Sequence, residues 1–126
     1  MSFADNAEIK LVYIGNDPSV MRKVVQRRID ASHRLCGFKE GSVVCFDDSA
    51  YAELTRLTGG NISFARYVAF QALTYAAREL GPDWTPESPP YTITGNDIRR
   101  LGITYDEFAN MHDMGYPLVV DLKKPI

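Results

Sequence analysis

Cysteine and histidine are scarce in this sequence, and long apolar runs are missing. Cys36 and Cys45 are the only cysteines, which is too few for the disulfide framework of a small secreted domain. No stretch approaches the ~18 to 20 apolar residues of a membrane-spanning helix, and the amino-terminal MSFADNAEIK lacks the basic region and apolar run of a signal peptide. We therefore expect a cytoplasmic protein that has no membrane partner.

An excess of charge of one sign is missing too. The 14 basic and 16 acidic side chains give a net charge of −2, so no global field draws the chain to nucleic acid or to anionic membranes. Any such attraction must come from a local patch. With 126 residues, of which 45% are hydrophobic, the chain can bury one sizeable core, and we expect a single domain over residues 1–126.

Patterns typical of catalysis and metal binding are also lacking. His33, Cys36 and Cys45 form the spacing H-x2-C-x8-C, which matches no zinc signature even with His112 added. Cys36 ends the apolar row of a predicted helix, where the helix dipole disfavours a reactive thiolate. We interpret Cys36 as a core cysteine and His33 as a surface histidine. Without a nucleophile–base pair or a phosphate-binding loop, we expect no enzyme activity, no cofactor and no metal.

The elements that the pattern does predict begin as a strand, a helix and a strand. Residues 8–14, EIKLVYI, are rich in β-formers, and Asp17 with Pro18 starts a helix over residues 18–36 with one apolar face. After a glycine-bracketed turn, the short apolar run at residues 42–46 indicates a buried strand.

The second half predicts further helices and a last strand. Asp47 to Ser49 can cap a short helix near residues 49–58, and the run at residues 62–80 is apolar or small on nearly every face, as in a buried central helix. Residues 81–92 hold four prolines and predict an extended connector. A short helical pair at 97–113 and a strand at 116–122 follow. We therefore predict an α+β fold, with a small mixed sheet packed on helices 18–36 and 62–80.

Residues 94–113, TGNDIRRLGITYDEFANMHD, resemble a helix-turn-helix. Gly102 lies at the turn, and the positions expected to face inward hold Leu101, Ile103, Phe108 and Met111. Two earlier positions depart from that pattern, because Asp97 replaces an apolar residue and Ile98 a small one. The second helix carries Asp106, Glu107 and Asp113 without lysine or arginine, so it lacks the phosphate contacts that dominate DNA affinity. We favour a structural helical corner, and a DNA-binding regulator is the alternative.

A basic outer face on the helix at 18–36 is the first feature that suggests a partner. It carries Arg22, Lys23, Arg27, Arg28 and Arg34 against Asp30 alone. A solvated face explains such a run, and so does a surface complementary to an acidic protein, to nucleic acid or to the acidic final helix of another copy.

The proline-rich connector is the second such feature, because it holds Trp84 and Tyr91, and aromatic residues in a stiff segment often anchor interfaces. Trp84 can equally fold back onto the core edge. The leading hypothesis is a small non-catalytic binding or regulatory protein that occupies a protein partner, as a homo-oligomer, in the manner of bacterial or phage accessory proteins. A further alternative is a protein that sequesters an anionic, nucleotide-like ligand between Arg22, Arg27 and Trp84 or Tyr91.

Overall fold

Polar caps define where the first helices begin. The structure is a computed structural model and describes residues 17–81, 84–85, 87–114 and 122. Helix α2 (Pro18–Leu35) starts at Asp17, whose carboxylate accepts the Ser19 N–H at 2.9 Å, and α3 (Asp48–Thr58) starts at Asp47 in the same way. Both carboxylates satisfy amides that the first helical turn leaves unpaired. The predicted helices at 18–36 and near 49–58 are confirmed.

The central helix is α4 (Ile62–Leu80), capped by Asn61. Side chains on most of its faces are buried, including Phe64, Val68 and Leu73, which confirms the prediction of a buried helix at 62–80. Full burial of one such side chain contributes about 1.5 to 3 kcal/mol to folding, so α4 supplies a large part of the core.

The predicted pair at 97–113 is present as α5 (Gly95–Arg100) and α6 (Tyr105–Met114). A reciprocal capping box between Thr94 and Asp97 begins α5, and the Thr104 hydroxyl accepts the Glu107 N–H at 3.1 Å to begin α6.

Two short strands pair in parallel. β1 (Val44–Phe46) confirms the strand predicted at 42–46, and it lies beside β2 (Tyr91–Ile93) with Val44 opposite Tyr91. The prediction of a connector over 81–92 was wrong at its end, because Tyr91 and Thr92 belong to a strand. The two prolines directly before β2 made this segment resemble a connector. The strand that β2 pairs with lies far away in the sequence, so no local pattern indicates the pairing. The strands predicted at 8–14 and 116–122 lie outside the described residues, except for Leu122, which is in a turn.

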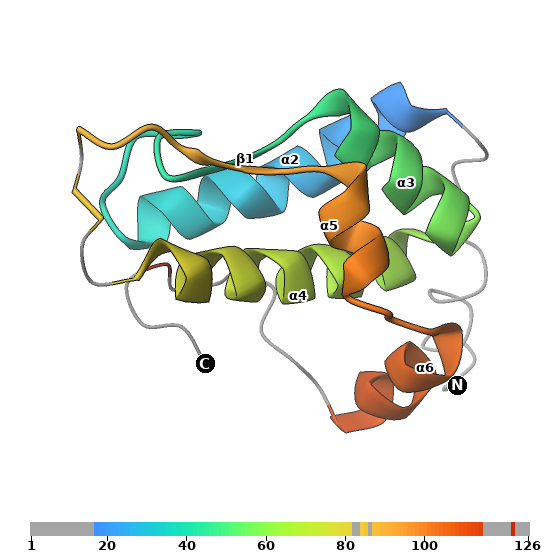
Figure 1. Cartoon of the computed structure of the whole chain (residues 1–126). Coiled ribbons are helices and arrows are strands. Elements are labelled where there is room, and N and C mark those ends of the chain that lie inside the picture. The colour runs from blue at the N-terminus through green and yellow to red at the C-terminus, as the bar shows by residue number, and fades with distance from the viewer. Residues whose placement is uncertain (1–16, 82–83, 86, 115–121, 123–126) are drawn as a thin grey trace.

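The architecture is a small α+β fold, as predicted. In Figure 1, α2 and α4 run alongside one another with the strand pair crossing above them, while α3 and α5 stand together at one end. The largest fully buried side chains come from several elements and form one cluster, which includes Met21, Ile29, Leu54, Tyr51, Tyr67, Leu73, Ile93, Ile98 and Phe108. Among the helices in the described part of the chain, none combines the length and apolarity that crossing a membrane requires.

Candidate functional site

The carboxyl ends of the two strands lie at one edge of the sheet. Asp47 follows β1 and begins α3, and Thr94 follows β2 and begins α5. Because the strands are parallel, both helices start from the same edge, at the end where α3 and α5 stand side by side (Figure 1). In parallel sheets this edge is the usual place for ligands.

The two strand–helix junctions are joined by short contacts. The Asp47 N–H donates to the Ile93 carbonyl at 3.1 Å, and the Gly95 N–H donates to the Ser49 hydroxyl at 2.8 Å. A Cβ on Gly95 would lie 2.8 Å from the Ser49 carbonyl oxygen, which is closer than a real Cβ atom comes. Glycine is therefore what allows α5 to approach α3 so closely.

A hollow of about 340 Å³ opens between α3 and α5. We call it the α3–α5 hollow, and its lining consists of Ser49, Ala52, Glu53, Arg56, Thr94, Gly95, Asn96 and Arg99. Glu53 is only 5% exposed. Arg56 binds both of its carboxylate oxygens, through Nε at 3.0 Å and through Nη2, and Arg99 Nη1 donates to Oε1 at 3.0 Å.

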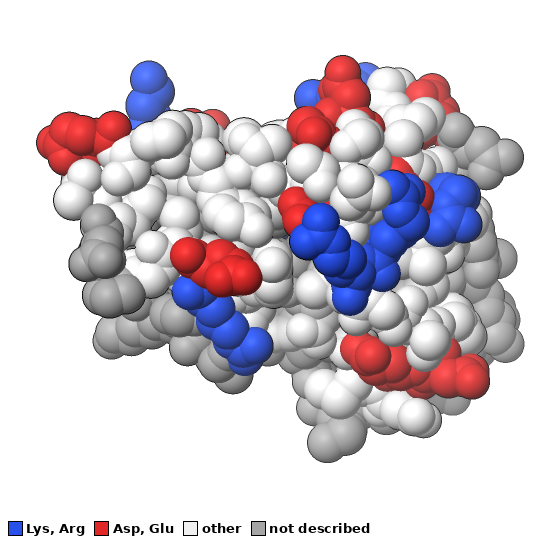
Figure 2. All heavy atoms as spheres, viewed as in Figure 1, with Lys and Arg blue, Asp and Glu red and all other residues white. Residues whose placement is uncertain are grey.

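The charges in this hollow do not cancel. The hydrogen bond from Arg56, supported by the one from Arg99, lowers the pKa of Glu53, so Glu53 is ionised at neutral pH. Two guanidinium groups therefore share one carboxylate. Among the side chains that line the hollow, one positive charge has no matching negative charge. Figure 2 shows lysine and arginine side chains gathered over α5 and the adjacent end of α3, whereas aspartate and glutamate cover α6.

A second hollow, of about 330 Å³, lies on the α2 side of α3. Pro18, Ser19, Arg22, Asp48, Tyr51 and Ala52 line it. Arg22 pairs with Asp48, and its guanidinium carbon lies 4.7 Å from the centre of the Tyr51 ring. Tyr51 donates to Gln26 Oε1 at 2.9 Å, and burial raises the pKa of Tyr51 to about 12, although Arg22 opposes the rise.

A third hollow, of about 250 Å³, is lined by Pro18, Ala52, Thr55 and Arg56. It shares lining residues with each of the other two. Ala52 borders all three hollows. We call the residues that line them the Ala52 surface. Its guanidinium groups, those of Arg22, Arg56 and Arg99, are each held by a carboxylate.

The basic residues predicted on the outer face of α2 are distributed along the helix. Arg22 belongs to the Ala52 surface. Lys23 and Arg27 are exposed and Arg28 is half-buried, and within the described residues no carboxylate forms an ion pair with these three. Arg34, near the carboxyl end of α2, pairs with Glu40 at 2.8 Å.

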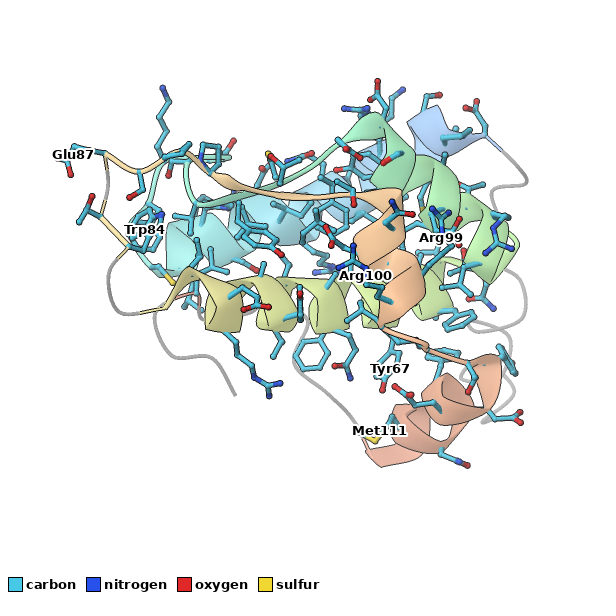
Figure 3. The ribbon with its side chains drawn as sticks, in the orientation of Figure 1. Tyr67, Trp84, Glu87, Arg99, Arg100 and Met111 are labelled. Atoms are coloured by element: carbon cyan, nitrogen blue, oxygen red, sulfur yellow. The ribbon has the colours of Figure 1, made fainter. Side chains whose placement is uncertain are left out.

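Trp84 and Tyr91, the two aromatic residues predicted to anchor a partner, lie outside the Ala52 surface. Trp84 is half-buried and meets Phe38 edge to face, with ring centres 5.2 Å apart. Tyr91 lies in β2, with its ring 6.4 Å from that of Tyr75. In Figure 3, Trp84 lies near Glu87 at one end of the molecule, and Arg99 with Arg100 lies on α5 toward the other end. The structure therefore does not bring Trp84 to Arg22.

The interpretation of His33 as a surface residue was wrong. His33 is fully buried, its Nδ1 lies 2.8 Å from the Ile29 carbonyl oxygen, and its Nε2 accepts the N–H groups of Val43 and Val44 at 3.2 Å. The apolar row of α2 continues through His33 because the imidazole satisfies backbone amides that enter β1.

The two cysteines have structural contacts. Cys36 is buried, as predicted, and its sulfur accepts the Leu122 N–H at 3.2 Å. Cys45 lies 3.5 Å from the Thr92 hydroxyl, sulfur to oxygen, across the two strands. Among the described residues, no set of three His, Cys, Asp or Glu side chains is placed to hold a metal ion.

The helix-turn-helix candidate packs against α4. Phe108 of α6 stacks on Phe64, with ring centres 5.2 Å apart, and Glu107 accepts a hydrogen bond from the Tyr67 hydroxyl. The position expected to hold a small residue, Ile98, is fully buried. Asp106 and Glu107, in the first turn of α6, are exposed.

Sequence reasoning missed Glu53, Arg56 and Arg99. The available signal was a polar residue directly after each strand, Asp47 after β1 and Thr94 after β2, because such residues mark the edge of the sheet where α3 and α5 begin. This signal requires β2 to be identified as a strand. Since β2 resembles a proline-rich connector, no local pattern places Arg99 beside Glu53.

Comparison with known proteins gives no relative. No protein-family model matches the chain, and neither does any curated protein or solved structure.

Proposed function

We propose that this protein is a non-catalytic cytoplasmic binding protein that holds an acidic segment of a partner protein on the Ala52 surface. One observation carries the proposal: Arg22, Arg56 and Arg99 surround adjoining hollows while Asp48 and Glu53 hold their guanidinium groups in place. A held guanidinium loses less freedom on binding and presents its remaining N–H groups to carboxylates in a fork.

The exposed edge of α2 supports an acidic partner as well. Lys23 and Arg27 are exposed on the same helix as Arg22 and add positive charge to its outer side. Charges at the rim of an interface raise the rate of encounter with an oppositely charged partner more than they raise its affinity.

A binding role is favoured over catalysis by the way the reactive side chains are used. Both ring nitrogens of His33 contact the backbone, and the thiols of Cys36 and Cys45 face backbone and hydroxyl groups. A nucleophile or general base must reach a substrate, and these contacts occupy the imidazole of His33 and the two thiols.

A DNA duplex is a weaker candidate for the binding partner than an acidic protein segment. The exposed carboxylates of Asp106 and Glu107 lie on the helix that would read DNA, where they would repel phosphates. A nucleotide clamp of Arg22 and Trp84 is disfavoured by distance, because Trp84 packs on Phe38 beyond the far end of α2. From Arg22 to that end the helix extends roughly 20 Å at ~1.5 Å per residue.

Selection from a displayed library of random dodecapeptides tests the proposal. We expect the immobilised protein to enrich peptides rich in aspartate and glutamate, and we expect Arg22→Gln combined with Arg99→Gln to weaken the selected peptides at least about tenfold, since a hydrogen bond to a charged group contributes about 1.5 to 3 kcal/mol. Arg34→Gln is the matched control, because Arg34 is an exposed, ion-paired arginine outside the Ala52 surface.

Enrichment of neutral peptides, or equal losses in the control and the double variant, would contradict the proposal. Titration of a mixed DNA duplex at about 50 and 200 mM salt separates the alternative, because phosphate contacts produce a steep salt dependence. Tight duplex binding with such a slope would replace the protein partner by DNA.

A further inference from the structure

The α3–α5 hollow offers hydrogen-bond donors and few free acceptors. The hydroxyls of Ser49 and Thr94 are already used: Ser49 accepts from Gly95 and donates to Asp47, and Thr94 exchanges hydrogen bonds with Asp97. Both hydroxyl protons are therefore committed, and the hollow favours an entering group that accepts hydrogen bonds from its other donors.

The donors come from two arginines and one amide. Arg56 binds Glu53 through Nε and Nη2, which leaves its Nη1 group. Arg99 uses Nη1 on Glu53 and Nη2 on the Asn96 side-chain oxygen, which leaves its Nε–H. Because Asn96 accepts through its oxygen, its amide nitrogen remains a donor.

Net charge selects among the possible acceptors. Among the lining side chains, the two guanidinium groups and the Glu53 carboxylate sum to one positive charge. The Asp47 and Asp97 carboxylates accept hydrogen bonds from the lining hydroxyls of Ser49 and Thr94 and add negative charge next to the hollow. The hollow therefore suits an anion that carries no more than a single charge. A doubly charged phosphate would leave an excess negative charge beside Glu53, and like charges in a partly buried site repel. A carboxylate fits both the charge and the fork geometry of arginine.

Rigidity is the third property that suits such a group. Glu53 is 5% exposed and is held on α3, while the approach of Gly95 to Ser49 fixes α5 against α3. Both arginines therefore keep their separation before any ligand arrives, as a preorganised site requires.

We infer that the α3–α5 hollow is the receptor for the carboxylate of an aspartate or glutamate side chain of the partner, bound between Arg56, Arg99 and Asn96. The inference rests on the proposed function for the source of that carboxylate. It deepens the proposal, because it assigns one side chain of the partner to one place on the Ala52 surface.

Glutarate is the probe, because one of its two carboxylates can enter the hollow while the other, three methylene groups away, stays in solvent. Neutral glutaramide is its matched control. In a two-dimensional ¹⁵N NMR titration of the full chain, we expect glutarate to shift the Gly95 amide, the Asn96 side-chain amide and the Arg99 Nε–H along one saturable curve. The dissociation constant should be on the order of millimolar, as for other ligands of this size. Glutaramide should leave the three signals unmoved.

Substitutions then locate the site. Arg99→Gln should weaken glutarate about tenfold or more, and Arg99→Lys should weaken it too, because lysine keeps the charge but loses the fork. Arg34→Gln, at an exposed, ion-paired arginine outside the Ala52 surface, should have no effect. Amide spectra of each variant check that the fold is retained.

The outcomes separate the site from the proposed function. Shifts that do not saturate, or equal weakening by Arg34→Gln and Arg99→Gln, would overturn the carboxylate site. If acidic peptides bind while glutarate leaves the hollow unchanged, the proposed function is supported and the carboxylate site is contradicted. If glutarate binds as expected and no acidic peptide does, the carboxylate site is supported and the proposal of an acidic protein partner is contradicted.

Discussion

His33 shows how one side chain can connect two elements. Its Nε2 accepts two backbone N–H groups, so the proton of the neutral ring is on Nδ1, which donates to the Ile29 carbonyl. The ring thereby joins α2 to the start of β1. At the scale of residues this is the clearest case in which burial changed the role that the sequence suggested.

Replacing His33 by alanine should lower the free energy of unfolding by about 1 to 3 kcal/mol, because the N–H groups of Val43 and Val44 would remain buried without their acceptor. Urea unfolding measures the change. The neighbouring Arg34→Ala removes an exposed ion pair and should cost less than about 1 kcal/mol. Equal losses in the two variants would contradict the structural role of the imidazole.

Gly95 is required because no side chain fits between it and the Ser49 carbonyl oxygen. Gly95→Ala should destabilise the fold by about 1 to 3 kcal/mol, because the new methyl group would overlap the Ser49 carbonyl and push α5 from α3. Thermal unfolding measures the loss. Asn96→Ala, at the next position and exposed, should stay within about 0.5 kcal/mol of the wild type. A Gly95→Ala protein as stable as the wild type would show that the junction is looser than the structure indicates.

At the scale of elements, α3 and α5 are joined by one buried acid. Glu53 on α3 accepts from Arg99 on α5, and the two residues are 46 positions apart in the sequence. Each helix starts at its own local cap, but their mutual placement depends on this long-range contact and on the Gly95 approach.

Glu53→Gln should reduce stability at neutral pH by about 1 to 2 kcal/mol, since the amide has no charge to hold two arginines that are themselves more than half exposed to solvent. The pKa of Glu53 is lowered in the folded state by Arg56 and Arg99. Its contribution is therefore complete above the ordinary carboxyl pKa and is lost as the pH falls through the lowered folded value.

Denaturant unfolding between about pH 7 and pH 2.5 measures this dependence. The difference between the wild type and Glu53→Gln should shrink toward zero at the acidic end. Asp48→Asn is the control, because Asp48 is 94% exposed in its pair with Arg22 and should change stability little at any pH. A difference that stays constant with pH would show that the charge of Glu53 does not hold the helices together.

At the scale of the whole molecule, charge is segregated although it nearly cancels in total. The net charge is −2, yet basic side chains cover α5 and the adjacent end of α3 while acidic ones cover α6 (Figure 2). Surfaces of opposite charge on one chain allow copies to associate head to tail, with α6 of one copy against α2 or α5 of the next.

We therefore expect self-association that salt weakens. Light scattering at low salt should give a mass above the 14.1 kDa of one chain, and the mass should fall toward that value near 1 M salt, where charges are screened within about 3 Å. Lys23→Glu combined with Arg27→Glu should lower the mass at low salt. A mass of one chain at every salt concentration would contradict the homo-oligomer predicted from the sequence.

The sequence by itself determined where the helices lie, that α2 has one apolar face and that α4 is apolar on nearly every face. Asp17, Asn61 and Thr104 each act within three residues along the chain, so short-range pattern is enough to predict them. The buried Ile29, Phe64 and Phe108 follow in the same way from helical spacing.

Only the tertiary structure decided the pairing of β2 with β1, the burial of His33 and the meeting of Arg99 with Glu53. A strand of three residues after two prolines has no period of its own, and its hydrogen bonds go to backbone far away along the chain. The candidate site lies where these distant segments come together, because two arginines and a glutamate gain a shared geometry only when the strands have placed α3 beside α5.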